Sequence, residues 1–383
     1  LRARDITWSK LRRPDKIWPR LGLIKYFASL PKIAQTVVKS WPDAREFLPQ
    51  LNMNHVPFGS NPRVSVIMTT YNGAKLVPKS IQAILDQTFE DFELIVIDDG
   101  SSDATVEVVQ CFDDPRIRLL PNPQNMGISR SRNRALSLAR GEFIACNDQD
   151  DISKPVRLGK QIGFLDAHPE VLLVSAAVQL NNGSETWADP MPTSSDPLLL
   201  HLSLFFGRHN ITYSTVCTRA SAIRKHNLTF RQEFHYAEDF EFYHQVARIG
   251  SISTLPDILV TSRIHGANAS WRHEQEMAAN GRRFLSKEYA ELLGHDIAQD
   301  DMELIWRILV RKLGAKSTGD LERIARLMAK TTKAFKQRYL SSGTASHEVD
   351  QFVAKIWWSI VRTGAETGIG FPALLMYNAF PEL

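Results

Sequence analysis

Short apolar segments alternate with amphipathic segments between residues 62 and about 180, and this alternation constrains the fold more than any other feature of the sequence. The apolar segments lack the polar alternation of a half-exposed strand, which is typical of strands covered on both faces. We expect strands at 63–72, 92–103, 117–122 and 141–151. The intervening segments have helical spacing, and we expect helices at 74–89, 104–112 and 129–140. This order predicts an α/β fold, a mostly parallel sheet with helices on both faces.

Acidic residues follow two of the expected strands at the point where each strand ends. Asp98 and Asp99 come after the run "ELIVI", and Asp148, Asp150 and Asp151 come after "EFIAC". One interpretation is structural, because Asp is common in turns and at helix N-termini. The other is a ligand site, because the carboxyl ends of parallel strands meet at one edge of the sheet, where ligands bind. Two acidic turns at the same edge favour a metal-bound, phosphate-bearing ligand.

The composition is that of an ordinary globular protein. The chain has 383 residues, 43% hydrophobic and 23% charged, which is enough for two domains or for one large domain with extensions. The formal net charge of +4 and the pI near 8.9 weakly favour anionic partners such as phosphates or anionic lipid. We expect no nucleic-acid partner.

The three cysteines and the lack of long apolar segments bear on location. Cys111, Cys146 and Cys217 are odd in number and fit neither a disulfide framework nor a zinc-ligand spacing. We expect reduced, buried thiols. No segment reaches the roughly 18 to 20 apolar residues of a membrane span, and the start of the chain shows no signal peptide. These features predict a cytoplasmic location.

Three regions are expected along the chain. Residues 1–61 are a basic extension, 62–270 the main α/β domain and 271–383 a helical region. The basic extension is either a solvated segment that packs on the main domain or a contact with an anionic membrane or polymer. Residues 352–364 predict an amphipathic helix, which we expect to pack on its own protein, with membrane-surface attachment as the alternative.

Three segments carry a family resemblance. "VSVIMTTYNGAKLVPKSIQAILDQTFEDFELIVIDDGSSDAT", "NMGISRSRNRALSLARGEFIACNDQDDISKPVRLGKQIGFLD" and "AEDFEFYHQVARIG" occur in the same order as in family 2 glycosyltransferases, which they resemble. The resemblance covers about 63–270. It implies the GT-A fold, which is Rossmann-like, and an enzyme that transfers a sugar from a nucleotide diphosphate to an acceptor hydroxyl with inversion.

The resemblance implies a metal site. The segment Asp148-Gln149-Asp150 fits the family's Asp-X-Asp motif, in which Asp150 is the direct metal ligand and Asp148 lies near the ribose or the metal. Asp151 orients the turn, and His265 resembles a position near the diphosphate and the metal. Mn²⁺ or Mg²⁺ is the expected cofactor, since both prefer oxygen ligands and neutralise a departing diphosphate.

The resemblance also implies a nucleotide site. Tyr71 is expected to stack on the base and Thr69 to hydrogen-bond to it, although Pro often stands in the family where this chain has Thr69. Asp99 resembles the residue that accepts a hydrogen bond from the uracil ring N–H, which favours a UDP-sugar. Arg130 and Arg132 are candidates for diphosphate contact, or are ordinary solvated helix residues.

Glu238 and Asp239 match the family's acidic pair near the acceptor. Inverting transfer needs one general base, and Asp239 is the expected base, with Glu238 positioning it or the acceptor. The alternative is that both are acids at a helix N-terminus, where the helix dipole favours negative charge.

The expected function is therefore metal-assisted transfer from a UDP-sugar to a saccharide or lipid-linked saccharide, in the synthesis of a bacterial-type surface polysaccharide or glycolipid. Family analogy places it in the cytoplasm, with peripheral contact at the inner face of the plasma membrane. The alternatives are a nucleotidyltransferase, for which "TTYNGAK" lacks the usual Gly-rich, basic phosphate loop, and a non-catalytic GT-A scaffold. No "QxxRW" signature of processive members is found, which favours transfer of one or a few sugars.

Overall fold

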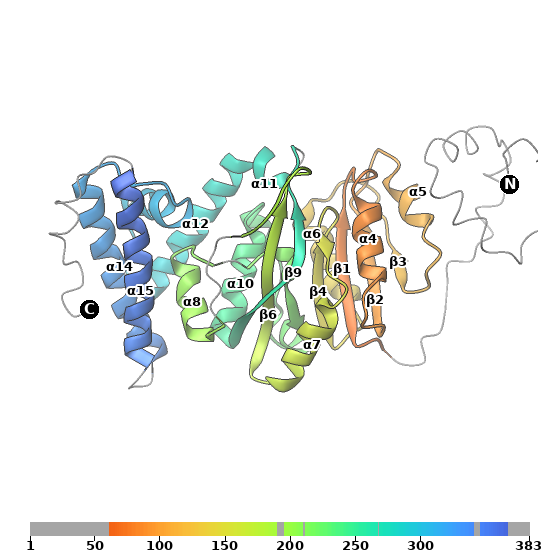
Figure 1. Cartoon of the computed structure of the whole chain (residues 1–383), viewed down its shortest axis with the longest axis horizontal. Helices are drawn as coiled ribbons and strands as arrows, with labels where there is room; N and C mark the ends of the chain where they lie inside the picture. Colours follow the sequence, from red (N-terminus) through yellow and green to blue (C-terminus); the bar gives the residue numbers. More distant parts are fainter. Residues whose placement is uncertain (1–60, 190–194, 210, 267, 341–344, 367–383) are drawn as a thin grey trace, which may run out of the picture. The chain divides into compact units, whose positions relative to one another are not determined.

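The computed structural model describes residues 61–189, 195–209, 211–266, 268–340 and 345–366 (Figure 1). These residues all belong to one of the two compact units into which the chain divides, Phe58–Leu383. The predictions for the basic N-terminal extension lie outside the described residues. The predicted boundary between the main domain and the helical region, at residue 270, stays a prediction.

A single sheet forms the centre of this unit, with the strand order β3-β2-β1-β4-β8-β6-β9-β5 and with β7 paired to β6. The strands are β1 (Val64–Thr70), β2 (Phe92–Asp98), β3 (Ile117–Leu119), β4 (Phe143–Asp148), β5 (Ile152–Ser153), β6 (Val171–Asn181), β7 (Thr186–Ala188), β8 (Cys217–Arg219) and β9 (Ser251–Arg263). The four predicted strands are β1 to β4, which are parallel to one another. Beyond β4 the sheet is mixed: β8 is antiparallel to β4 and β6, whereas β6 and β9 are parallel.

The register of the parallel strands brings the two acidic turns to one edge of the sheet. Thr70 of β1 lies opposite Asp98 of β2, and Thr69 lies opposite Asp148 of β4. The prediction that both acidic turns lie at the same edge is therefore confirmed, because all three strands end at the same level.

Helices cover both faces of the sheet, as predicted, because alternate strand residues point to opposite sides. Val66 and Met68 of β1 pack with α4 (Val77–Leu85) and α7 (Arg157–Ala167), which lie on the near face in Figure 1. Ile67 points the other way and packs in a second core with α6 (Ile128–Leu138) and α10 (Glu238–Ile249). The remaining helices of this part are α5 (Thr105–Gln110), α9 (Ala220–His226) and the 3-10 turns η4 (Tyr213–Thr215) and η5 (Gln232–Phe234).

A third core belongs to the helices after β9. It joins α8 (Pro197–Phe205) to α12 (Glu274–Leu293), α13 (Gln299–Ile305), the π-helix η6 (Trp306–Val310), α14 (Thr318–Tyr339) and α15 (Ala345–Glu366), whereas α11 (Ala269–Arg272) is a short turn before α12. The hydroxyl of Tyr289 in α12 donates a hydrogen bond to the carbonyl oxygen of Phe205 in α8 (3.0 Å). No strand follows β9 in the part of the chain that the structure describes.

The predicted amphipathic helix is α15. Val353, Ile356, Trp357, Ile360 and Val361 are buried in the third core. The expectation that this face packs on its own protein is confirmed.

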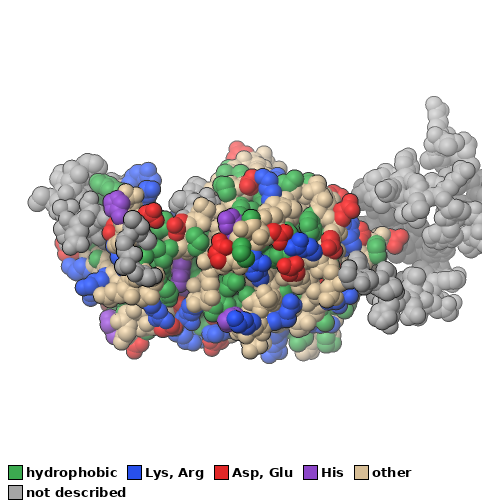
Figure 2. All heavy atoms as spheres, turned by 90° about the horizontal axis from the view of Figure 1, so that it is seen from below, with side chains coloured by type: hydrophobic (Ala, Val, Ile, Leu, Met, Phe, Trp, Pro, Cys, Tyr) green, Lys and Arg blue, Asp and Glu red, His purple; other side chains and the backbone are tan. Residues whose placement is uncertain are grey.

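The surface shows mixed charge and one exposed thiol. Cys146 and Cys217 are buried as predicted, but Cys111 is exposed, because it follows the last turn of the short helix α5 rather than lying inside it. Figure 2 shows acidic, basic and hydrophobic side chains interspersed over the face it presents. Among the described helices, none combines the length and the apolar character that a membrane span requires.

Candidate active site

The end of β1 is tied to the end of β4 by one amide side chain. Gln149 Oε1 accepts a hydrogen bond from the backbone N–H of Tyr71 (3.1 Å), and Gln149 Nε2 donates to the carbonyl oxygen of Tyr71 (3.3 Å). Gly73 leaves room for this amide, since a Cβ on Gly73 would lie 2.1 Å from Gln149 Oε1. Tyr71 is 46% exposed and Thr69 is half-buried, so both predicted base contacts lie at an accessible edge.

Asp99 is buried and fixes the segment that leads into α6. Its Oδ1 accepts hydrogen bonds from Asn122 Nδ2 (2.7 Å), Ser131 Oγ (2.8 Å) and the backbone N–H of Met126 (2.8 Å). Its Oδ2 accepts from the backbone N–H of Gly127 (2.9 Å). Asp99 thereby joins β2 to α6, and because three of the four donors share Oδ1, an acceptor position is left on Oδ2. The predicted contact with a uracil ring stays a prediction.

Asp150 is surrounded by polar side chains from the turn after β9, of which the sequence analysis singled out only His265. Its Oδ2 is 2.9 Å from His265 Nε2 and accepts a hydrogen bond from Asn268 Nδ2 (3.0 Å). The Asn268 side chain also accepts from the backbone N–H of His265 (2.6 Å), which fixes the turn after β9. Arg263 donates to the backbone carbonyl of Asp150 and to that of Leu76 (2.9 Å), tying β9 to α4.

Burial raises the pKa of two carboxyl groups in this turn. The pKa of Asp150 is raised to about 6, first by burial and then by the neighbouring Asp148. The pKa of Asp151 is raised to about 7 by burial and by both other carboxylates of the turn. Asp151 also accepts a hydrogen bond from the backbone N–H of Arg263 (3.3 Å), which agrees with its predicted place in orienting the turn. A nearby cation would relieve this crowding of negative charge.

Arg132 joins the acidic turn after β4 to the acidic pair at the start of α10. Its Nη1 donates to Glu238 Oε1 (2.8 Å), and its Nη2 donates to Asp148 Oδ1 (3.1 Å). Arg132 and Glu238 are both buried, whereas the Asp148 side chain is 30% exposed. Arg130 lies two residues earlier but is exposed and donates to Gln232 Oε1 (2.9 Å), so the two arginines of the motif have separate surroundings.

Asp239 occupies the first turn of α10 and is half-buried. Its Oδ1 accepts a hydrogen bond from the backbone N–H of Phe240 (2.7 Å). Burial raises the pKa values of Asp239 and Glu238 above their ordinary range, against the opposing effect of Arg132. A carboxylate whose pKa is raised towards neutral pH is a stronger base than an exposed one, which suits proton abstraction.

The donor atoms around Asp150 fit a divalent cation that also binds a ligand. In the described part of the chain, no group of three or more His, Cys, Asp or Glu side chains is placed to hold a metal ion. Two such side chains, Asp150 and His265, do meet, and burial together with Arg263 lowers the pKa of His265, which favours the neutral imidazole that binds metals. Mg²⁺ and Mn²⁺ commonly take one or two protein ligands and complete their shell with phosphates and water.

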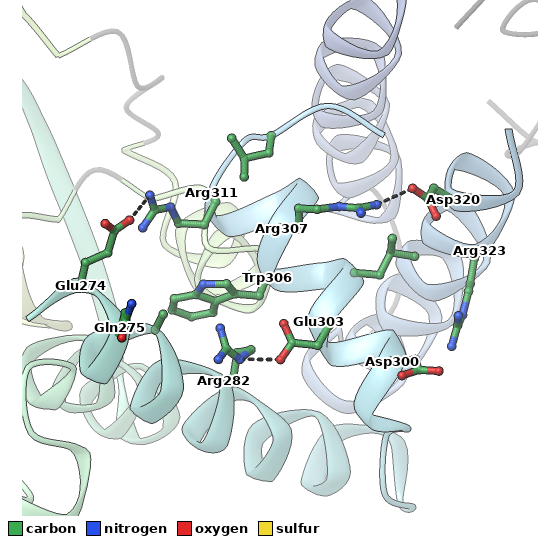
Figure 3. A pocket seen from close by; sticks show the side chains of 13 residues that line it. Glu274, Gln275, Arg282, Asp300, Glu303, Trp306, Arg307, Arg311, Asp320 and Arg323 are labelled. Atoms are coloured by element: carbon green, nitrogen blue, oxygen red, sulfur yellow. Dashed lines mark hydrogen bonds and ion pairs between the residues drawn. The ribbon is translucent and has the colours of Figure 1, made fainter. Parts of the chain in front are cut away.

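A pocket of about 800 Å³ lies elsewhere, among α12, α13, η6 and α14 (Figure 3). Arg282 pairs with Glu303 (2.9 Å), and Figure 3 shows two more ion pairs across the pocket, Arg307 with Asp320 and Arg311 with Glu274. Each of these three arginines is paired with an acidic residue of the pocket. The pocket therefore differs from the edge of the sheet where the acidic turns lie.

Sequence reasoning missed Arg263, Asn268 and Ser214, whose Oγ accepts a hydrogen bond from the backbone N–H of Asp148 (2.9 Å). Arg263 stands two residues before His265 and Asn268 three residues after it, and this proximity is the signal that could have found both. Ser214 carries no such signal, because its contact joins segments far apart in the chain.

Known proteins resemble this chain in sequence and in fold. Residues 65–228 match the model of glycosyl transferase family 2. An uncharacterized glycosyltransferase of Haemophilus influenzae is 31% identical over 254 residues, which cover 62% of this chain and 77% of the relative. The chain therefore belongs to glycosyl transferase family 2 and is a glycosyltransferase.

Two further proteins are similar to parts of the chain. The Escherichia coli protein WfgD, named UDP-Glc:alpha-D-GlcNAc-diphosphoundecaprenol beta-1,3-glucosyltransferase, is 44% identical over 102 residues, 27% of this chain and 40% of WfgD. The crystal structure of S. aureus TarS 1-349 in complex with UDP-GlcNAc has a TM-score of 0.51 and 19% identity, and covers 80% of this chain and 89% of TarS 1-349. At that identity the likeness shows the fold alone, and the predicted α/β GT-A fold is confirmed.

Proposed function

We propose that the chain transfers a sugar from a UDP-sugar to a hydroxyl of a saccharide or lipid-linked saccharide, with inversion and with the help of Mn²⁺ or Mg²⁺. One observation carries this proposal. Acidic residues from distant segments meet at the carboxyl edge of the sheet, where Arg132 links Asp148 to Glu238 and where Asp150 meets His265.

The donor site is proposed at the ends of β1, β2 and β4. The exposed Tyr71 would stack on the base and Thr69 would hydrogen-bond to it, while Asp99 holds the segment beside them. The name of WfgD begins with UDP-Glc, and the TarS structure is a complex with UDP-GlcNAc, which supports a UDP-sugar as the donor.

The metal site is proposed at Asp150 and His265, whose side-chain atoms lie 2.9 Å apart. A divalent cation bound there would neutralise the charge that develops on the departing diphosphate. Asp148 would lie on the nucleotide side of this corner, where its partly exposed carboxylate faces Arg132.

Asp239 is proposed as the general base and Glu238 as the residue that positions it. Asp239 would take the proton of the acceptor hydroxyl while the hydroxyl oxygen forms its bond to the anomeric carbon and the bond to the diphosphate breaks. The products would be the glycosylated acceptor and UDP, and the proton would remain on Asp239. Glu238 accepts its hydrogen bond from Arg132, so its carboxylate has a fixed place beside Asp239.

The name of one relative supports a lipid-linked saccharide as the acceptor. WfgD is named for action on a diphosphoundecaprenol-linked sugar, which supports a lipid-linked saccharide and a place in surface polysaccharide or glycolipid synthesis. Such an acceptor would require contact with the inner face of a membrane, and we propose a cytoplasmic protein with peripheral contact.

A thermal-shift titration of the full chain with UDP, dTDP, GDP and CMP, each with and without Mn²⁺, tests the proposal. Ligands that bind the folded state raise the melting temperature by mass action. We expect the largest shift with UDP and Mn²⁺ together. A larger shift with GDP or CMP would overturn the donor assignment, and no shift with any nucleotide would contradict a nucleotide site at this edge of the sheet.

A further inference from the structure

Arg132 is buried, with 3% of its surface exposed, and is held on several sides. Its guanidinium carbon lies 3.5 Å from the centre of the Tyr213 ring and 5.5 Å from that of Phe230. Its Nε has no hydrogen-bond partner in the described structure, nor does Oε2 of its partner Glu238. A guanidinium enclosed in this way has little freedom to swing towards a ligand.

The helix that carries Arg132 is anchored at two points. Asp99 accepts hydrogen bonds from Gly127 and Ser131 at the start of α6, which ties the helix to β2. Asn133 Nδ2 donates to the carbonyl oxygen of Phe230 (2.8 Å), and Asn133 Oδ1 accepts from the backbone N–H of Phe230 (2.8 Å). The second anchor ties α6 to the segment before α10, so the position of Arg132 is fixed relative to both sides of the site.

The two carboxylates that Arg132 contacts come from opposite sides of the proposed reaction. Asp148 ends β4 on the donor side, and Glu238 begins α10 on the acceptor side. Without a cation between them these carboxylates would repel each other, together with Asp239. A planar guanidinium can donate to both at once in fixed directions, which a lysine ammonium on a flexible stem does not reproduce.

We propose that Arg132 is a positioning residue that couples the donor side of the site to the acceptor side by holding Asp148 and Glu238 at a fixed separation. This inference rests on the proposed function, because that function assigns the two sides. In this proposal Arg132 acts through the carboxylates of Asp148 and Glu238 and does not contact the diphosphate directly. It also makes nucleotide affinity sensitive to Glu238, a residue that touches no nucleotide in the proposed function.

A double-mutant cycle on nucleotide affinity tests this coupling. The dissociation constant of UDP with Mn²⁺ is measured by calorimetry for the wild-type chain, Glu238→Gln, Arg132→Lys and the double variant. We expect Glu238→Gln to change the dissociation constant about fivefold or more in the wild-type background, and less than twofold when Arg132 is already replaced. A merely structural role of Arg132 would lower the melting temperature without this background dependence.

The matched control is Arg118→Lys. Arg118 also donates to a buried carboxylate, Glu93 (2.6 Å), near the start of β2, where the proposed site has no part. We expect this variant to melt at a lower temperature and to bind UDP with unchanged affinity.

The outcomes separate the inference from the proposed function. Equal effects of Glu238→Gln in both backgrounds, or no effect in either, would overturn the coupling while the proposed function stands. No UDP binding by the wild-type chain would overturn both. If Arg132→Lys does not fold, the cycle of Glu238→Gln with Asp148→Asn keeps Arg132 in place, and additive effects there would overturn the coupling.

Discussion

The two ends of β2 and β4 show two different uses of buried acids. At the amino end, Glu93 is fully buried and accepts hydrogen bonds from Ser65 Oγ (2.7 Å), Arg118 Nη1 (2.6 Å) and the backbone and side chain of Arg140. At the carboxyl end, Glu238 is also buried but has one arginine partner, and its Oε2 has no hydrogen-bond partner in the described structure.

The pKa values of these acids move in opposite directions. Burial alone would raise the pKa of Glu93, but the hydrogen bonds from Arg140, Ser65 and Arg118 together lower it. At the carboxyl end, burial raises the pKa values of Glu238 and Asp239 because fewer donors offset it. An acid with a lowered pKa stabilises the fold at neutral pH, whereas acids with raised pKa values reduce its stability there. Buried acids with raised pKa values are typical of functional sites, which supports the proposed roles of Glu238 and Asp239.

Replacement of the proposed base should have the largest effect. We expect Asp239→Asn to reduce transfer from a UDP-sugar by about 100- to 10 000-fold, the usual contribution of a general base. Because the pKa of Asp239 is raised in the folded state, stability falls as the pH rises from the unfolded pKa of Asp through that raised pKa, so the variant should melt at the same or a higher temperature at pH 7. Transfer rates and melting curves of the same preparation check this, and retained transfer would contradict the base assignment.

Replacement of Glu93, the buried acid at the amino end of β2, should have the opposite effects on stability and on the reaction. We expect Glu93→Gln to lower the free energy of unfolding by about 2 to 3 kcal/mol, since it loses charge-assisted hydrogen bonds, and to leave UDP affinity unchanged. In the wild-type chain this contribution is present above the unfolded pKa of Glu and is lost as pH falls through the lowered folded pKa. Denaturant unfolding at pH 7 and at acidic pH measures both.

The control for this prediction is Glu142→Gln. The Glu142 carboxylate pairs with Arg63 (3.3 Å) but is 58% exposed, so its removal should cost less than about 1 kcal/mol. An equal loss in the two variants would contradict the stabilising role of Glu93.

A smaller effect should follow from crowding at the end of β1. We expect Gly73→Ala to weaken UDP binding about threefold, because the new Cβ displaces Gln149 and removes a hydrogen bond of about 1 kcal/mol to Tyr71. Gly163→Ala in α7 is the control, since nothing lies within 4 Å of the added Cβ. Calorimetry of both variants checks this, and unchanged affinity in Gly73→Ala would show that the amide bridge is not needed for UDP binding.

The sequence predicted the part of the fold in which apolar strands alternate regularly with amphipathic helices, β1 to β4. β1, β2 and β4 have six or seven residues each, and the apolar runs and the acidic ends of β2 and β4 predicted that both acidic turns lie at one edge. In the mixed half of the sheet, β5 and β8 have two and three residues, which is too short for any periodicity. The long strands β6 and β9, with 11 and 13 residues, were missed for another reason, because no regular alternation of strand and helix surrounds them.

The site was predictable where a motif carried it and not where folding assembled it. The meeting of Asp150 with His265 follows the motif resemblance, but its support by Arg263 and Asn268 depends on contacts more than 100 residues apart. Burial of Arg132 likewise depends on Tyr213, from a segment without a motif. Such contacts depend on the tertiary arrangement, of which the local sequence gives no sign.

The most direct test of the account is calorimetric titration of the wild-type chain with UDP in Mn²⁺ and in EDTA, repeated with Asp150→Ala and Glu93→Gln. We expect binding in Mn²⁺ that weakens by about tenfold or more in EDTA and in Asp150→Ala, and that is unchanged in Glu93→Gln. Binding of equal strength with and without the metal, or its loss in Glu93→Gln alone, would contradict the assignment of the carboxyl end as the functional end.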